Sequence, residues 1–138
     1  MTNSDLKQIW WPLRITYGFI ACAAGADKFL NMLTAWEKYV SPWVAGFVPG
    51  GAVALMHAVG VIEIAVGILI LTRWTKLGAY VASAWLLAVA CNLLLAGYFD
   101  IAVRDIAMSV GAWTLARVTE LAVPVTHSVP DAPSPARA

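Results

Sequence analysis

The chain has 138 residues, of which 61% are apolar and only 12% are charged, whereas soluble domains carry roughly 25% charged residues. A water-soluble domain of this size leaves much of its surface exposed, so it could not hide so large an apolar fraction. The formal net charge of +1 gives no indication of nucleic acid or of a polyanionic partner. The seven Trp are typical of a chain that meets the membrane–water boundary, and we expect lipid to be its main solvent.

Four stretches are long and apolar enough to cross a membrane as helices, which takes about 20 residues each. They cover residues 10–30, 51–72, 75–97 and 101–121. Strands of a membrane barrel are only about 10 residues long and alternate in polarity, which these stretches do not. The sequence therefore predicts an all-α chain in which residues 1–121 form a four-helix transmembrane bundle.

The first stretch is not expected to be a cleaved signal peptide, because Trp10, Trp11, Pro12 and Arg14 stand where the apolar core of a signal would lie. Basic residues favour one end of the predicted bundle. Six lie there: Lys7, Arg14, Arg73, Lys76, Arg117 and Arg137. The other end has three: Lys28, Lys38 and Arg104. The positive-inside rule then predicts that both termini are cytoplasmic, in a membrane that we expect to be the bacterial inner membrane.

The segment 31–50 between the first two predicted helices is rich in aromatic residues. Trp36, Tyr39 and Trp43 follow helical spacing, and Ser41-Pro42 interrupts the run as a cap followed by an N1 proline would. We expect a short segment lying on the membrane surface, with a lid over an outward-facing cavity as the alternative.

Residues 122–138 are rich in proline and small residues and predict a disordered tail, in which His127 is solvated. The two cysteines, Cys22 and Cys91, do not form a CxxC pair, and we expect two small buried residues. No zinc site is expected, since four cysteines are lacking and His127 is far along the chain.

Glu63 and His57 are polar residues within an otherwise apolar helix. Glu63 lies near the middle of the predicted span, where an ionised carboxylate costs a few kcal/mol unless it takes a proton or finds a partner. At about 100° per residue, His57, Gly60, Glu63 and Gly67 fit within an arc of roughly 120°. We therefore expect Glu63 and His57 to face the other helices rather than lipid.

The other predicted helices carry polar residues in the same half of the bundle. These are Lys28, with Asp27 beside it, Asn92, and the pair Arg104-Asp105. Opposite charges at similar depth could neutralise one another in a nearly neutral buried network.

Two interpretations of this network remain open. It either fixes the register of the helices and does nothing else, or it forms a site, such as a proton path or a pocket for a quinone head group. A metal site made from His57 and Glu63 alone lacks ligands. We expect Trp85, Trp113 and Tyr80 to be packing or interface residues.

The order of these polar residues resembles the DoxX-like family of small four-helix membrane proteins over residues 10–120. The resemblance rests on three short motifs: Arg14-x3-Gly18-x6-Gly25-x2-Lys28-Phe29, then Gly60-x2-Glu63-x3-Gly67-Ile68-x2-Leu71, then Arg104-Asp105 followed by small residues. It implies Arg14, Lys28, Glu63, Arg104 and Asp105 as candidate site residues, and it assigns nothing to His57.

The family includes proteins associated with a terminal oxidase, with thiosulfate:quinone oxidoreduction and with redox-stress complexes. The resemblance therefore implies a small membrane subunit of a quinone-linked oxidoreductase, with quinone as the possible cofactor. The alternative is a non-catalytic assembly or accessory subunit, because four helices without a haem-ligand pair, flavin motif or CxxC leave little chemistry to perform alone. Either function predicts membrane lipid and other membrane protein subunits as partners. A small-molecule carrier is less favoured, since the chain shows no inverted repeat.

Overall fold

The computed structural model describes residues 3–122, and within that range the chain is helical and contains no strand. The α-helices are α1 (Asn3–Leu30), α2 (Pro42–Ala45), α3 (Gly51–Leu71), α4 (Thr75–Ala96) and α5 (Phe99–Ala122), with a 3-10 turn, η1 (Trp36–Tyr39), before α2. The all-α prediction is confirmed. Of these helices, α1, α3, α4 and α5 are long, and α2 has four residues.

The predicted helix boundaries are close to the observed ones, except at the start of α1. That helix begins at Asn3 rather than near Trp10, and Pro12 lies inside it. A hydropathy pattern misses such a polar first segment, although Asp5 in the first turn favours a helix there because it faces the positive end of the helix dipole. The end of α4 is set by Gly97, which has a φ of +83°, a left-handed conformation that glycine adopts without strain.

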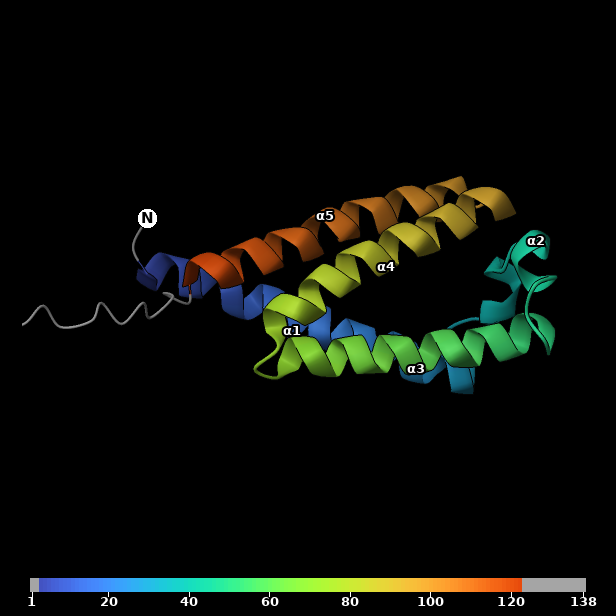
Figure 1. The fold of residues 1–138 in the computed structure, drawn as a ribbon, viewed down its shortest axis with the longest axis horizontal. Coiled ribbons are helices and arrows are strands. Elements are labelled where there is room, and N and C mark those ends of the chain that lie inside the picture. The colour runs from blue at the N-terminus through green and yellow to red at the C-terminus, as the bar shows by residue number, and fades with distance from the viewer. Residues whose placement is uncertain (1–2, 123–138) are drawn as a thin grey trace, which may run out of the picture.

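The long helices form two pairs, α1 with α3 and α4 with α5, which lie side by side along most of their length (Figure 1). The pairs approach each other near the α3–α4 turn and diverge toward α2. We call these the closed end and the α2 end. The start of α1 and the end of α5 both lie at the closed end (Figure 1).

The pair α1–α3 packs closely because glycines face each other across it. A Cβ atom built on Gly25 would lie 2.6 Å from the Gly60 carbonyl oxygen, and one built on Gly60 would lie 2.7 Å from the Gly25 carbonyl oxygen. Small residues let helix backbones approach in this way where lipid supplies no hydrophobic force between helices. Gly67 faces Cys22 of α1 in the same manner.

The closed end holds the largest apolar core and several hydrogen bonds between helices. The core consists of Val66, Ile70, Ala79, Ala82, Ala112, Leu115 and Ala116. The Trp10 indole donates to the Thr119 hydroxyl at 2.8 Å, which joins α1 to α5. The Thr75 hydroxyl donates to the Ile70 carbonyl at 2.8 Å, which fixes the α3–α4 turn.

The segment between α1 and α3 forms two short turns rather than one aromatic helical face. Ser41 caps α2, its hydroxyl accepting from the Val44 amide at 3.2 Å, and Pro42 follows it, as the sequence predicted. The prediction that Trp36, Tyr39 and Trp43 share a helical face is wrong, because the chain is extended at Val40 and Ser41 between η1 and α2.

The carboxyl of Glu37 in this segment has a pKa that differs from its ordinary value. Glu37 accepts a hydrogen bond from Asn31 Nδ2 at 3.0 Å. The backbone amide of Glu37 and the Asn31 side chain together hold the pKa of the Glu37 carboxyl below its usual value. Glu37 is therefore an anion at the α2 end.

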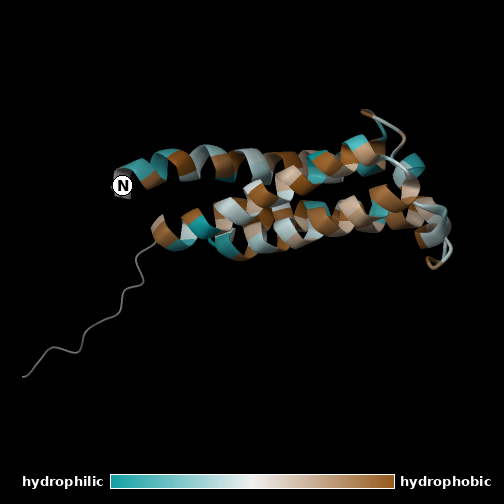
Figure 2. Ribbon diagram, turned by 90° about the horizontal axis from the view of Figure 1, so that it is seen from above, coloured by the Kyte–Doolittle hydropathy of each residue, from teal (hydrophilic) through white to brown (hydrophobic). Residues whose placement is uncertain are grey.

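Two of the described helices, α3 and α4, are long and apolar enough to cross a membrane by length and composition. Only 33% of the apolar window of α3 and 22% of that of α4 is buried inside the structure. Figure 2 shows that hydrophobic residues extend along all the long helices. The tail predicted for residues 122–138, including His127, lies outside the described residues except for Ala122, which ends α5.

Candidate functional site

A cavity of about 620 Å³ lies between the two helix pairs, and the segment before α3 contributes to its wall. Most of its lining is apolar, with Ile20, Leu55, Val59, Leu86, Val89 and Met108 among the residues that form it. The polar residues that reach it are Lys28, Thr34, Glu63, Asn92, Arg104 and Asp105, together with the aromatic side chains of Tyr17, Trp36, Tyr39 and Trp85. Pockets for small organic ligands have this size and this balance of lining.

On one wall of the cavity, Lys28 of α1 forms an ion pair with Glu63 of α3. The Lys28 Nζ atom lies 2.6 Å from Glu63 Oε2, and the two side chains are 6% and 17% exposed. The same ammonium group lies 4.1 Å from the centre of the Trp36 ring and 3.5 Å from the Ala24 carbonyl oxygen. Lys28 is thus neutralised, and an aromatic face covers it.

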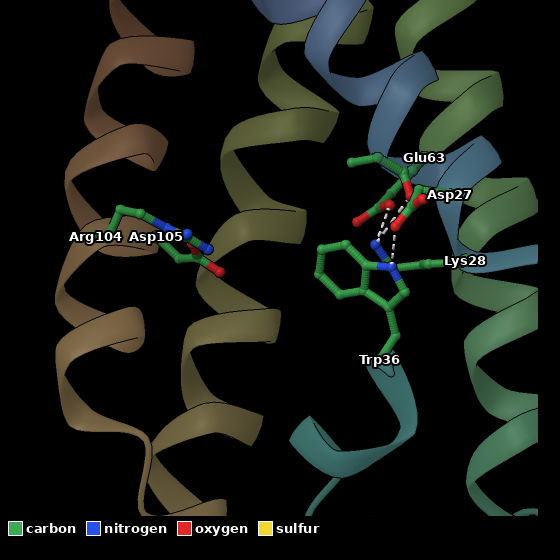
Figure 3. A network of polar contacts seen from close by, with 7 residues as sticks. Asp27, Lys28, Trp36, Glu63, Arg104 and Asp105 are labelled. Carbon is green, nitrogen blue, oxygen red and sulfur yellow. Dashed lines mark hydrogen bonds and ion pairs between the residues drawn. The ribbon is translucent and has the colours of Figure 1, made fainter. Parts of the chain in front are cut away.

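Asp27, the neighbour of Lys28, holds the following segment in place rather than joining the ion pair. Its carboxylate accepts from the backbone amides of Met32 and Leu33 and from Trp36 Nε1 at 2.7 Å. These bonds fold the chain back after α1 and bring Trp36 over Lys28 (Figure 3).

On the opposite wall, Arg104 and Asp105 of α5 form a second ion pair. Arg104 Nε and Nη2 both donate to Asp105 Oδ1 at 3.1 Å. The Asp105 side chain is 7% exposed, whereas that of Arg104 is 62% exposed. In Figure 3 this pair lies across a gap from Lys28, Glu63 and Trp36.

The single buried network predicted from the sequence is therefore not formed. Within residues 3–122, no hydrogen bond or ion pair joins Lys28–Glu63 to Arg104–Asp105. Each carboxylate is neutralised by a cation on its own side, because the diverging helix pairs separate the two walls. The cavity lies between them.

Asn92 reaches the cavity but does not contact either ion pair. Its side-chain oxygen accepts from the Ser41 amide at 3.0 Å, and its Nδ2 donates to the Tyr39 carbonyl at 2.8 Å. Asn92 therefore attaches the segment before α3 to α4 and holds Tyr39 at the cavity wall. This favours the alternative prediction for residues 31–50, in which the segment is a lid over the cavity.

His57 does not face Glu63, and the prediction that the two face the bundle together is wrong. His57 is exposed and stacks on Phe29, with ring centroids 5.1 Å apart and an interplanar angle of 11°. Six residues separate His57 from Glu63, which places them about 120° apart around a helix. That angle lets Glu63 reach the cavity while His57 points outward.

Arg14, which the family resemblance implies as a site residue, lies at the closed end and away from the cavity. It donates to the carbonyls of Ile70, Leu71 and Thr72 at 3.0, 2.6 and 2.8 Å, which are the last acceptors of α3. Its guanidinium also lies 4.7 Å from the centre of the Trp10 ring. Arg14 therefore caps the C-terminus of α3 and fixes α1 to it.

Trp85 of α4 is a cavity residue that the sequence interpretation left as packing. Its indole lines the cavity, and its shielded Nε1 atom has no hydrogen-bond partner among the described residues. Trp85 lies seven residues before Asn92, which is two turns along the same helix face. That spacing was the sequence signal for its position.

The two cysteines are free thiols, with Cys22 half-buried and Cys91 exposed, so neither is buried as the sequence predicted. Residues 3–122 contain no group of three or more His, Cys, Asp or Glu side chains that could hold a metal ion.

Comparisons with known proteins return no match to a protein family, to a curated protein or to a solved structure. The similarity to the DoxX-like family therefore stays a prediction from the sequence motifs.

Proposed function

We propose that the chain is an integral membrane protein in which α1, α3, α4 and α5 all span the bilayer. Each of these helices presents large apolar side chains outward, for example Phe19, Val61, Leu95 and Val110, which are 66%, 59%, 62% and 60% exposed. In water so much exposed apolar surface would favour aggregation, whereas in lipid it costs nothing. The low buried share of α3 and α4 supports the same arrangement.

Four spans put both ends of the chain on one side of the membrane, and the shared position of the start of α1 and the end of α5 agrees with this (Figure 1). Arg14, Arg73 and Lys76 lie toward that end, so the positive-inside rule makes it the cytoplasmic side. We propose the bacterial inner membrane as the location.

We further propose that the cavity binds a lipophilic molecule with a small polar head, of the quinone class. The observation that carries this proposal is a 620 Å³ apolar cavity, open between two helix pairs, with two neutralised ion pairs facing each other across it. An apolar tail fits the lining of aliphatic and aromatic side chains, and a polar head finds hydrogen-bonding groups at the two ion pairs. A purely register-fixing role would not require a cavity between the two pairs.

Together with the sequence resemblance, this site supports a small membrane subunit of a quinone-linked oxidoreductase. The chain would then bind and orient the quinone, while the electron donor would come from a partner subunit.

The experiment compares two matched substitutions on α1. Ala21 lines the cavity and Ala23 is exposed on the outside of the same helix. In lipid nanodiscs, wild type and Ala23→Phe should bind decylubiquinone with similar affinity, and Ala21→Phe should bind it several-fold more weakly because the ring fills the cavity. Binding is measured by equilibrium partition of the quinone against protein-free nanodiscs.

Equal binding by the Ala21→Phe and Ala23→Phe proteins would refute the cavity as the site, and a wild-type protein that binds neither decylubiquinone nor its hydroquinone would refute the quinone proposal. Copurification from the native membrane then tests the accessory function. A Glu63→Gln protein that lowers the yield of a larger complex but leaves turnover per complex intact would favour assembly over quinone binding.

A further inference from the structure

The polar groups of the cavity differ in whether their hydrogen-bonding atoms are already used. Lys28 Nζ donates to Glu63 Oε2 and to the Ala24 carbonyl, and the Trp36 ring lies over it. An ammonium group has three hydrogens, so these neighbours occupy it. Lys28 is therefore not a free donor for a ligand.

The Asn92 side chain is also engaged, since its oxygen and its nitrogen both bind the segment before α3. The Trp85 indole nitrogen is unpaired but shielded, so a ligand does not reach it without a rearrangement. The N–H groups of Arg104 that Asp105 does not use remain as donors, and they can bind the oxygen of a quinone, a hydroquinone or an ether alike.

The carboxylates differ from these groups, because each has an oxygen that its cation does not use. Both bonds from Arg104 go to Asp105 Oδ1, and Lys28 contacts Oε2 of Glu63. Among the described residues, no hydrogen bond to Asp105 Oδ2 or Glu63 Oε1 is formed. Unlike Trp85 Nε1, neither oxygen is a buried atom without a hydrogen-bond partner. Two acceptor oxygens on opposite walls are thus available to a molecule in the cavity.

The charges in the cavity sum to zero, with Lys28 and Arg104 balancing Glu63 and Asp105. A charged ligand would have to be desolvated without a counter-charge, which is costly in an apolar site. The ligand that fits is therefore neutral, with hydrogen-bond donors on its head group.

We infer that the cavity selects a neutral ring bearing hydroxyl groups, so that it prefers the hydroquinone form of its ligand to the quinone form. This inference rests on the proposed function and adds which redox form the site holds. A hydroquinone carries an O–H on opposite sides of its ring, and each can donate to one carboxylate. A quinone carbonyl can only accept, and it would face carboxylate oxygens that also only accept.

The test uses three probes with the same decyl tail in wild-type nanodiscs: decylubiquinone, its hydroquinone kept reduced without oxygen, and the dimethyl ether of that hydroquinone. The ether retains the ring and the oxygens but has no O–H. Hydrogen bonds to charged acceptors each contribute about 1.5–3 kcal/mol, so one such bond predicts at least about tenfold tighter binding of the hydroquinone. The quinone and the ether should bind alike and more weakly.

Equal binding of the quinone and the hydroquinone would overturn this inference and leave the proposed function standing. Failure of all three probes to bind would remove the proposed function itself. In Asp105→Asn, one face of the amide can donate to a carbonyl, so the preference should shrink by several-fold or reverse. The comparison of the hydroquinone with its ether uses wild type alone, so its result does not depend on whether a variant folds.

Discussion

At the scale of single residues, the Lys28–Glu63 pair shows how a charged group persists inside an apolar helix. Its two side chains are only 6% and 17% exposed, so water solvates neither charge well. Burial of each charge is offset by the other and by the Trp36 ring, and the pair joins α1 to α3. Removing one member leaves the other charge without compensation.

The first prediction follows from this dependence. Glu63→Leu should destabilise the protein by about 3 kcal/mol, because Lys28 remains buried and unpaired, whereas the double substitution Lys28→Met/Glu63→Leu should recover most of that loss. The free energy of unfolding is measured by SDS titration in mixed micelles, with helical circular dichroism as the signal. If the double variant is as unstable as the sum of both single variants, the charges do not compensate each other.

A second prediction concerns two Trp residues with different hydrogen bonding. Trp10 donates to Thr119, whereas the Trp85 nitrogen has no partner among the described residues. Trp→Phe removes the same atoms at both sites, but only Trp10→Phe also breaks a hydrogen bond and alters the ring beneath the Arg14 guanidinium. Trp10→Phe should destabilise by about 1 kcal/mol more than Trp85→Phe, in the same titration.

Equal losses at Trp10 and Trp85 would contradict this prediction and would indicate a hydrogen bond from the Trp85 indole, for instance to Glu63. The comparison therefore also reports whether Glu63 shifts toward Trp85.

The sequence predicted some of these residue contacts and not others. A carboxylate in an apolar span must be compensated, which is why Glu63 and a cation such as Lys28 could be grouped in advance. The rotation of a helix about its axis cannot be obtained from its own residues, so the outward position of His57 was not predicted. Asn92 and Arg14 bind backbone atoms of distant segments, which no side-chain pattern reveals.

At the scale of secondary structure elements, the close approach of α1 and α3 determines how Lys28 reaches Glu63. The approach depends on Gly25 and Gly60, whose missing side chains let the backbones meet. Gly25→Val should therefore separate the helices and destabilise the protein by about 1–3 kcal/mol or more, whereas Ala26→Val, on an exposed position of the same helix, should have little effect.

Unfolding titrations of the two valine variants measure this difference. A Gly25→Val protein of unchanged stability, with an experimental structure in which the Lys28–Glu63 pair is intact, would contradict the proposed dependence on close contact.

Helix positions were predicted from hydropathy more closely than the connections were. Long apolar runs predict where α3 and α4 lie, because an uninterrupted apolar run of about 20 residues favours a helix of that length. The segment between α1 and α3 depends on bonds to Asp27 and Asn92 from residues nearby and far away in sequence, and its fold could not be derived from its own spacing.

At the scale of the whole molecule, the last prediction concerns whether lipid surrounds the outer face of α4. Cys91 is exposed on α4, where the proposed arrangement puts lipid. In a Cys22→Ser protein, a nitroxide attached to Cys91 should be relaxed strongly by oxygen and weakly by a nickel chelate. Power-saturation electron paramagnetic resonance in nanodiscs measures both.

The control places the nitroxide at Lys38→Cys in a protein without native cysteines, since Lys38 is exposed in η1. That label should be accessible to the nickel chelate. Equal nickel access at both labels would argue against α4 as a membrane-spanning helix.

The distribution of contacts between the two ends has a mechanical consequence. Arg14 on the end of α3 and Trp10 on Thr119 both lie at the closed end, whereas at the α2 end the helix pairs are bridged through Asn92 and the intervening segment. The two helix pairs are thus joined firmly at the closed end, and a bulky ligand in the cavity would push them apart at the α2 end. Widening should be a rotation about the Arg14 region that stretches the Asn92 bridge first and leaves the contacts at the closed end unchanged.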